Sequence, residues 1–121
     1  MVLIDANAIL RYILYDNADM AEKVCELIED TKVFIRYEVL AEVVYVLNKV
    51  YSMPRSEIGE YITKVLQLPN VETESEVVLL LALETYSDVN IDFVDCILHS
   101  LNATYGYGVF TFDKQLNTLI N

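Results

Sequence analysis

The chain has 121 residues, of which 55% are hydrophobic, and a formal net charge of −11 from 19 acidic and 8 basic side chains. This length and hydrophobic content predict one globular domain over residues 1–121 and exclude a disordered chain. The basic residues are scattered, so the sequence lacks the basic footprint of proteins that bind nucleic acids strongly unaided, and its charge favours metal ions or a basic polypeptide as partners.

The sequence shows no signal for a membrane or for secretion. No apolar stretch reaches the ~18 residues that a membrane-spanning helix needs, and the first residues lack the basic region that begins a signal peptide. Cys25 and Cys96 stand outside any CxxC or CxxH spacing and are interpreted as ordinary buried thiols, although a single pair leaves a disulfide open. We therefore expect a cytoplasmic protein with no membrane partner.

Short apolar runs predict strands, and apolar residues at helical spacing predict the helices between them. The predicted strands are residues 1–5, 33–35, a short stretch around Val71, and 109–112. The predicted helices are residues 7–15, 21–30, 38–51, 54–68, 76–83, 92–105 and 114–120. Thr73 and Glu76 have the spacing of a capping box at the start of the fifth helix. Short strands that alternate with helices predict an α/β domain with a mainly parallel sheet, in which ligands bind at the carboxyl ends of the strands.

Four acidic residues are predicted to lie half-inward, each at the end or the edge of an element. Asp5 ends the first strand, and Asp113 follows the last one. Glu42 is placed beside Val46, at the rim of the apolar stripe of its helix. Asp95 borders the predicted core face of the sixth helix. That face consists of Val94, Ile97, Leu98 and Leu101.

Four carboxylates gathered at one end of a sheet would repel one another strongly in a medium of low dielectric constant. A divalent cation removes this repulsion, and hard oxygen ligands without a His or Cys cluster suit Mg²⁺ or Mn²⁺. The pattern of acids therefore predicts a site for one of these two ions.

Several of these residues also have a purely structural interpretation. Asp113 fits equally well as the cap of the last helix, and Asp92 fits as the N-cap of the sixth helix. Asn7 fits either as the cap of the first helix or as a hydrogen-bond partner that holds Asp5. His99, one turn after the predicted ligand on the same helix, is interpreted as a single exposed histidine rather than a metal ligand.

Four segments in chain order resemble the PIN-domain ribonucleases, and most closely the VapC-type toxins of prokaryotic toxin–antitoxin pairs. VLIDANAIL resembles the opening strand and first acid of that family, and EVLAEVVYVL resembles the helix with its second acid, at Glu42. IDFVDCILHSLN contains Asp92 and Asp95, of which Asp95 is taken as the third acid because it borders the predicted core face. GVFTFDKQL resembles the closing T-x-D segment, with Thr111 and Asp113.

The resemblance implies a three-layer α/β/α fold and a Mg²⁺- or Mn²⁺-dependent endoribonuclease that cleaves single-stranded or structured RNA. It also implies a homodimer that is neutralised by a small antitoxin with a basic tail. The implied catalytic metal ligands are Asp5, Glu42, Asp95 and Asp113. The implied supporting residues are Asn7, Thr111 and Asp92.

Other proteins that begin with a strand ending in Asp fit the sequence less well. A haloacid-dehalogenase-type phosphatase has a second Asp two residues after the first, where this chain has Asn7. A response-regulator receiver has an acidic pair near the first strand and a Lys after a late strand, and neither arrangement is found. The remaining alternative is a degenerate PIN domain that acts as an acidic protein-interaction module without nuclease activity.

Overall fold

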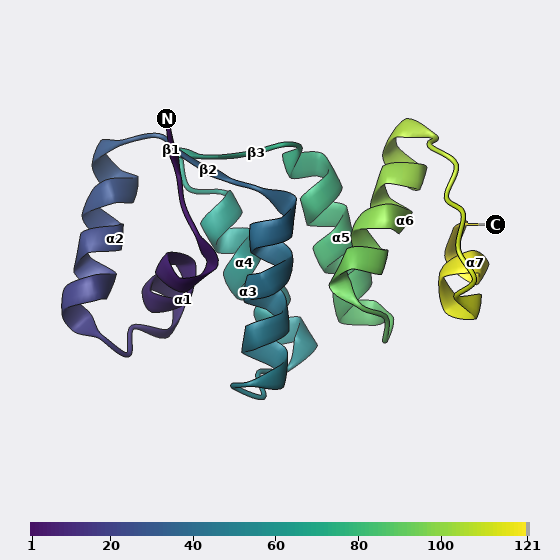
Figure 1. Cartoon of the computed structure of the whole chain (residues 1–121), viewed down its shortest axis with the longest axis horizontal. Coiled ribbons are helices and arrows are strands. Elements are labelled where there is room, and N and C mark those ends of the chain that lie inside the picture. The colour runs from purple at the N-terminus through teal and green to yellow at the C-terminus, as the bar shows by residue number, and fades with distance from the viewer. Residues whose placement is uncertain (121) are drawn as a thin grey trace.

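The computed structural model describes residues 1–120, which form three strands and seven helices in this range (Figure 1). The strands are β1 (Val2–Leu3), β2 (Val33–Ile35) and β3 (Val71–Thr73). The helices are α1 (Ala6–Leu14), α2 (Ala18–Asp30), α3 (Tyr37–Lys49), α4 (Arg55–Leu66), α5 (Glu76–Asp88), α6 (Phe93–Tyr105) and α7 (Lys114–Ile120). The predicted α/β fold is confirmed, and the arrangement is consistent with three α/β/α layers. No helix among residues 1–120 is both long and apolar enough to cross a membrane.

The sheet is parallel, with the strand order β1-β2-β3 in the described part of the chain. Val33 in β2 pairs with Val2 on one side and with Val71 on the other. The backbone N–H groups of Val2 and Ile4 donate to carbonyls next to and within β2, at 2.9 and 3.3 Å. Because alternate residues of a strand point their peptide groups to opposite sides, the peptide groups of Leu3 face the open edge of the sheet. β1 is therefore an edge strand.

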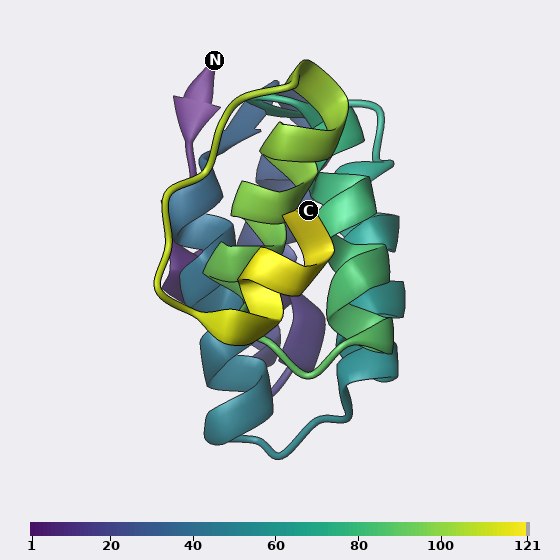
Figure 2. The same cartoon turned by 90° about the vertical axis from the view of Figure 1, so that its right-hand side faces the viewer.

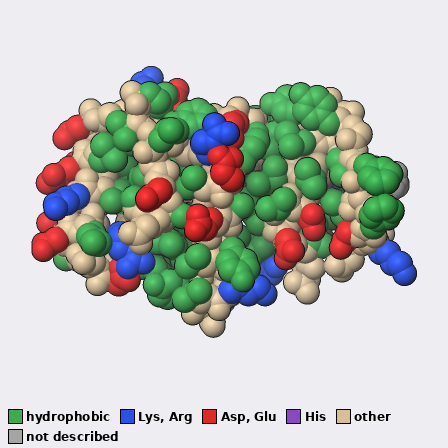
Figure 3. Space-filling view, viewed as in Figure 1, with side chains coloured by type: hydrophobic (Ala, Val, Ile, Leu, Met, Phe, Trp, Pro, Cys, Tyr) green, Lys and Arg blue, Asp and Glu red, His purple; other side chains and the backbone are tan. Residues whose placement is uncertain are grey.

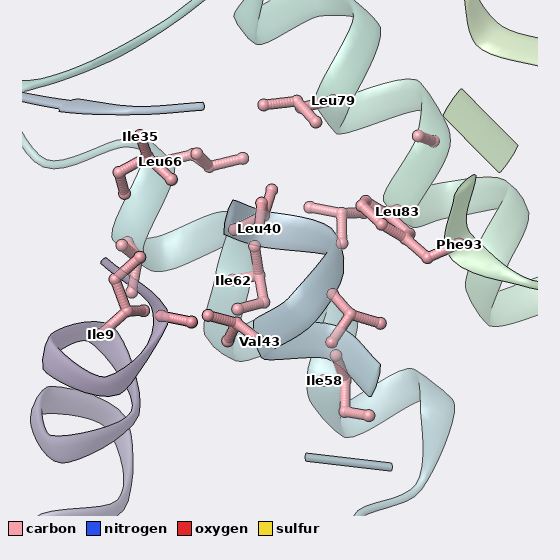
Figure 4. Packing of buried hydrophobic residues seen from close by; sticks show 14 of the residues in the cluster. Ile9, Ile35, Leu40, Val43, Ile58, Ile62, Leu66, Leu79, Leu83 and Phe93 are labelled. Atoms are coloured by element: carbon pink, nitrogen blue, oxygen red, sulfur yellow. The ribbon is translucent and has the colours of Figure 1, made fainter. Parts of the chain in front are cut away.

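The hydrophobic core lies between the sheet and the helices (Figure 4). Its largest fully buried side chains include Ile9, Ile35, Leu40, Leu47, Ile58, Ile62, Leu79 and Leu83. Burial of a side chain of this size contributes about 1.5–3 kcal/mol to folding. Because these residues come from four helices and from β2, the core holds together elements that are distant in sequence.

The packing of α6 against α5 differs from the predicted face. The buried residues of α6 are Phe93, Cys96, Ile97 and Ser100. Val94, which was predicted to face the core, is 55% exposed. The small residues at 96 and 100 allow α6 to approach α5 closely, and the Ser100 hydroxyl donates to the Val78 carbonyl at 2.6 Å. The prediction was right for Ile97 and wrong for Val94, because it counted only large apolar residues as core.

Helix starts are set by side chains that accept backbone N–H groups. The carboxylate of Asp5 caps α1, and Asn17 caps α2. Ser75 caps α5 through a bond from the Val78 N–H at 3.3 Å, so the predicted capping box was wrong and Thr73 lies in β3. These groups satisfy donors that a helix cannot pair internally.

The predicted strand at 109–112 is absent from the described structure. Gly106 ends α6 with φ of 72°, a left-handed conformation that glycine adopts without steric cost. The chain then runs as an irregular segment along the outside of α6 to α7 (Figure 2). Phe110 and Phe112 are 89% and 90% exposed. The composition of this segment favours a strand, but no neighbouring strand lies beside it to supply hydrogen bonds.

Candidate functional site

Asp5 is the second residue after β1 and the N-cap of α1. Its Oδ1 accepts the backbone N–H of Ala8 at 2.9 Å. The side chain remains exposed, and its second carboxylate oxygen is left over for another partner. Asn7, predicted either to cap the helix or to hold Asp5, lies exposed in the first turn of α1, and the cap is Asp5 itself.

Glu42 lies in the middle of α3 and is exposed. The buried residues of this helix are Leu40, Val43, Val44 and Leu47. Glu42 lies about 200° round the helix from Leu40, at ~100° per residue, and so faces outward instead of sitting at the rim. Glu38, one turn earlier, accepts a hydrogen bond from Arg36, which lowers the pKa of the Glu38 carboxyl. Among residues 1–120 Glu42 has no such partner, so it is the acid of α3 that is free to bind a cation.

Asp92 and Asp95 mark the beginning of α6. Asp92 occupies the N-cap position, as predicted, but its side chain makes no capping hydrogen bond and is exposed. Asp95 is half-buried, about 200° round the helix from the buried Phe93. The predicted reason for selecting Asp95, a position beside the core face, was therefore wrong. Its partial burial arises on the opposite side of the helix.

Asp113 begins α7 and lies near Asp95. Its Oδ1 accepts the Leu116 N–H at 2.8 Å, so the capping interpretation of Asp113 is confirmed. Thr111 supports this turn, because its Oγ1 accepts the Asp113 N–H at 3.0 Å and its carbonyl accepts a bond from the Asn117 amide. A capping carboxylate keeps acceptor capacity for a second partner, so this geometry leaves the ligand prediction open.

Electrostatics link the acids at the α6–α7 end. The pKa of Asp95 is raised above its ordinary value, first by partial burial and then by the negative charges of Asp113 and Asp92. A carboxylate whose ionised form is penalised in this way gains from a nearby cation. The charges of Asp92 and Asp113 therefore act on Asp95 at this end of the molecule.

The four predicted ligands are not gathered into one group. Within residues 1–120, no three or more His, Cys, Asp or Glu side chains come together closely enough to hold a metal ion. Asp5 precedes α1 and Asp113 precedes α7, and these helices lie toward opposite ends of the long axis (Figure 1). Acidic side chains are spread along the face shown in Figure 3, from its left end to its right end. A single chain therefore presents acids in two separate places, with Asp5 before α1 and with Asp92, Asp95 and Asp113 at the α6–α7 end.

A groove of about 410 Å³ passes between α3 and the start of α6. Asp92 and Asp95 line it, together with Lys49 and Arg55. A larger groove of about 710 Å³ between α4 and α5 contains none of the predicted site residues. The smaller groove is therefore the one that Asp92 and Asp95 line.

Arg55 holds the connection from α5 to α6, a role that sequence reasoning missed. Its guanidinium donates to the carbonyls of Tyr86, at 2.7 Å, and Val89, at 2.9 Å, and to that of Ile91. Its Cζ also lies 3.6 Å from the centre of the Tyr86 ring, which packs edge-on against Phe93. Three carbonyls between the end of α5 and Asp92 thus depend on one side chain from α4. Only the position of Arg55 just after Pro54, at a helix start, was available in the sequence.

Other reactive side chains are unsuited to catalysis. Both cysteines are free, and burial raises the pKa of the Cys96 thiol to about 12, so it stays protonated. His99 was predicted to be exposed, but it is half-buried, and its Nδ1 is buried without a hydrogen-bond partner in the described structure.

We expect Arg55→Lys to lower the free energy of unfolding by about 2 kcal/mol, because an ammonium cannot reach three carbonyls in a planar fork and leaves buried acceptors unpaired. Urea unfolding measures the loss, and hydrogen exchange of residues 88–93 should become faster. Lys49→Ala, on the wall of the same groove, should change stability by less than about 0.5 kcal/mol. Equal stabilities of Arg55→Lys and the wild type would contradict this role.

We expect Asp95→Asn to melt at a higher temperature than the wild type at pH 7 in EDTA. The folded-state pKa of Asp95 lies above the unfolded value of about 3.9, so its ionised form opposes folding. This penalty is present above the folded pKa and disappears as the pH falls through it. The difference in melting temperature should therefore shrink toward pH 4.

The matched control is Asp88→Asn, which removes an exposed acid at the end of α5. Its effect on the melting temperature should be small. A stabilisation by Asp95→Asn that persists undiminished at pH 4 would show that it has another cause.

The whole sequence is also similar to a known family. It matches the PIN domain over residues 2–119, a range that includes all four predicted ligands and the three parallel strands. None of the curated proteins matches the chain with significant similarity. Because the match spans nearly the full length and agrees with the observed α/β fold, this chain belongs to the PIN domain family.

Proposed function

We propose that this chain is a metal-dependent endoribonuclease that cleaves single-stranded or structured RNA, and that it is the toxin of a type II toxin–antitoxin pair of the VapC type. The PIN domain is generally a nuclease fold, and its nucleases generally use divalent metal ions. The observation that carries the proposal is the family match over residues 2–119, with an acid at each of the four motif positions.

The chemical type of the donors fits Mg²⁺ or Mn²⁺, whereas their placement in a single chain does not. Carboxylate oxygens are the ligands that these hard cations prefer. Within the described residues, however, the acids lie apart and form no cluster of three that could hold a metal ion. When bound by a complete set of acids, such an ion would supply an activated water and stabilise charge on a scissile phosphate.

The side chains of the protein contribute position and charge to this function. Asp5 and Asp113 are each held in place by a helix N-terminus. The raised pKa of Asp95 marks the acid whose charge is least well solvated, and so the one that gains most from a cation. Lys49 in the neighbouring groove is an exposed cation that can meet an RNA phosphate. We propose that the substrate enters along this groove.

We expect the protein to cleave a single-stranded RNA oligonucleotide in Mg²⁺ or Mn²⁺ but not in EDTA. Asp5→Asn should reduce the cleavage rate by at least about 100-fold, the upper end of the loss caused by removing even an outer-shell partner of a metal. Asn caps a helix as well as Asp does, so this variant should stay folded. Circular dichroism checks the fold, and gel electrophoresis of labelled RNA measures the rate.

Asp88→Asn serves as the control and should cleave RNA at the wild-type rate. Cleavage that persists in EDTA, or full activity of Asp5→Asn, would contradict metal-dependent chemistry at these acids. If the wild type cleaves no RNA and its melting temperature does not respond to Mn²⁺, the chain is instead an acidic interaction domain.

The net charge of −11 supports a basic protein partner. We propose a small antitoxin whose basic tail places an Arg against the acids. A guanidinium binds two carboxylate oxygens at once and occupies the space of a metal ion. Apolar residues of the antitoxin would add affinity that charge alone does not supply.

We expect this inhibition to compete with the metal ion. Raising the Mn²⁺ concentration should weaken binding of the co-purified antitoxin in a titration, whereas Arg→Gln in its basic tail should restore RNA cleavage. Added NaCl of equal ionic strength controls for general screening of charge. An affinity that is indifferent to Mn²⁺ would place the antitoxin elsewhere on the surface.

A further inference from the structure

Two segments of the described structure, β1 and residues 109–112, each have an edge that pairs with no other strand. The first is the open edge of β1, where Leu3 is 70% exposed and directs its N–H and C=O away from β2. An unpaired sheet edge is a template for pairing with another strand. The residues around it, Met1 and Val2, are 70% and 37% exposed. This edge is therefore both apolar and unpaired.

The second feature is the segment 109–112, which has the sequence Val-Phe-Thr-Phe. β-branched and aromatic residues favour strands. In the described part of the chain, the peptide groups of Phe110 and Phe112 form no hydrogen bond with another backbone group. The two rings stack edge-on against each other, 5.3 Å apart, and almost their whole surface is exposed. The segment thus has the composition of a strand without the partner of one.

The segment is fixed at both ends, so its own β1 is out of reach. The Asn102 amide donates to the Tyr107 carbonyl at 2.8 Å, and the Asn117 amide donates to the Thr111 carbonyl at 3.0 Å. Leu116 in α7 is fully buried. β1 lies at the α1 side of the molecule and the segment at the α7 side, with α3 and α5 between them (Figure 1). Closure within one chain would require α7 to leave its place.

We propose that two copies of this chain form a dimer in which the segment 109–112 of each copy pairs with β1 of the other. β1 and the segment both run from the top of Figure 1 toward the bottom, on the same face of the molecule (Figure 2). A two-fold axis along the vertical direction of Figure 1, in front of that face, brings opposite ends of the two copies together. Rotation about this axis leaves the top-to-bottom direction of β1 and of the segment unchanged. The exchanged strands are therefore parallel, like the rest of the sheet.

The apolar surface available is sufficient for a stable dimer. A buried phenylalanine removes roughly 150–250 Å² from water, so Phe110 and Phe112 contribute about 350 Å² per copy. The exchange occurs twice, and the β1 edges bury a comparable area, which brings the total to about 1,200 Å² or more. That is the lower bound for stable interfaces between proteins. A second copy is therefore a better occupant of this surface than solvent.

The strand exchange brings Asp5 of one copy close to the acids at the α6–α7 end of the other copy. Parallel pairing that aligns Ile4 with Phe112 places Asp5 of one copy beside Asp113 of the other, at the carboxyl ends of both strands. Asp95 accompanies Asp113, because the two already interact within one copy. Because α1 and α3 are in contact within one copy, the ligand set would then be Asp5 and Glu42 from one copy and Asp95 and Asp113 from its partner. This consequence rests on the proposed function, whereas the strand exchange itself does not.

Cysteine cross-linking tests the exchange directly. In this register Val2 lies opposite Phe110, so a copy with Val2→Cys is co-expressed with a differently tagged copy with Phe110→Cys. Both carry Cys25→Ser, and Cys96 is retained because it is fully buried. After oxidation we expect a disulfide-linked heterodimer on a non-reducing gel. Val50→Cys in place of Phe110→Cys is the control, since Val50 is also well exposed but lies at the end of α3, and it should give no such product.

The alternative occupant is the segment of the same chain. In that case a single copy with both Val2→Cys and Phe110→Cys would form an internal disulfide and remain a monomer, and the mixed copies would not cross-link. Either that result or the absence of any disulfide in both experiments would overturn the proposed exchange.

Activity in mixtures tests the shared site separately. Dimers formed from Asp5→Asn and Asp113→Asn copies contain one intact site per heterodimer, so random mixing should restore about a quarter of the wild-type RNA cleavage. Each variant alone should be inactive. A mixture that cross-links but stays inactive, when the wild type is active, would overturn the shared site. Cross-linking together with an inactive wild type would refute the proposed function and leave the exchange intact.

Discussion

Repulsion between carboxylates is the constraint on which the arrangement of this chain depends. With 19 acids and 8 basic residues, most acids have no cationic side chain to pair with. Asp5 and Asp113 find partners in helix N-termini, where peptide dipoles favour a negative charge. Asp95 also lies in the first turn of a helix, α6, but its partial burial and the nearby charges of Asp113 and Asp92 raise its pKa. The fold thus tolerates its acids largely by keeping them apart.

Much of the fold followed from local patterns in the sequence. The helices α1 to α7 and the first three strands were predicted in the correct order, since amphipathic spacing and short apolar runs are local properties. Errors arose where the decisive partner is distant in sequence. The segment 109–112 has a strand-like composition, but a strand exists only through a neighbour that local composition does not reveal. Similarly, the orientation of α6 depends on Ser100 reaching the Val78 carbonyl in α5.

The sequence predicted which kinds of residues form the candidate site, but it did not predict how these residues are arranged in space. Asp5 and Asp113 were expected at element ends and are found there, as caps. Glu42 and Asp95 face away from the buried stripes of their helices, because a position on a helical wheel does not tell which other elements cover that side. Arg55 was overlooked for a related reason. Its three carbonyl acceptors lie more than 30 residues away in sequence, and no local pattern marks such a contact.

The exposed pair Phe110 and Phe112 also has a consequence for solubility. At neutral pH the net charge keeps copies apart except where a specific contact offsets the repulsion. The isoelectric point is about 4.2, and near this pH the charge vanishes while the aromatic surface remains. Acidification relieves the penalty on Asp95 and at the same time removes the colloidal protection of the chain. A pH low enough to relieve the penalty on Asp95 is therefore also a pH at which this protein tends to precipitate.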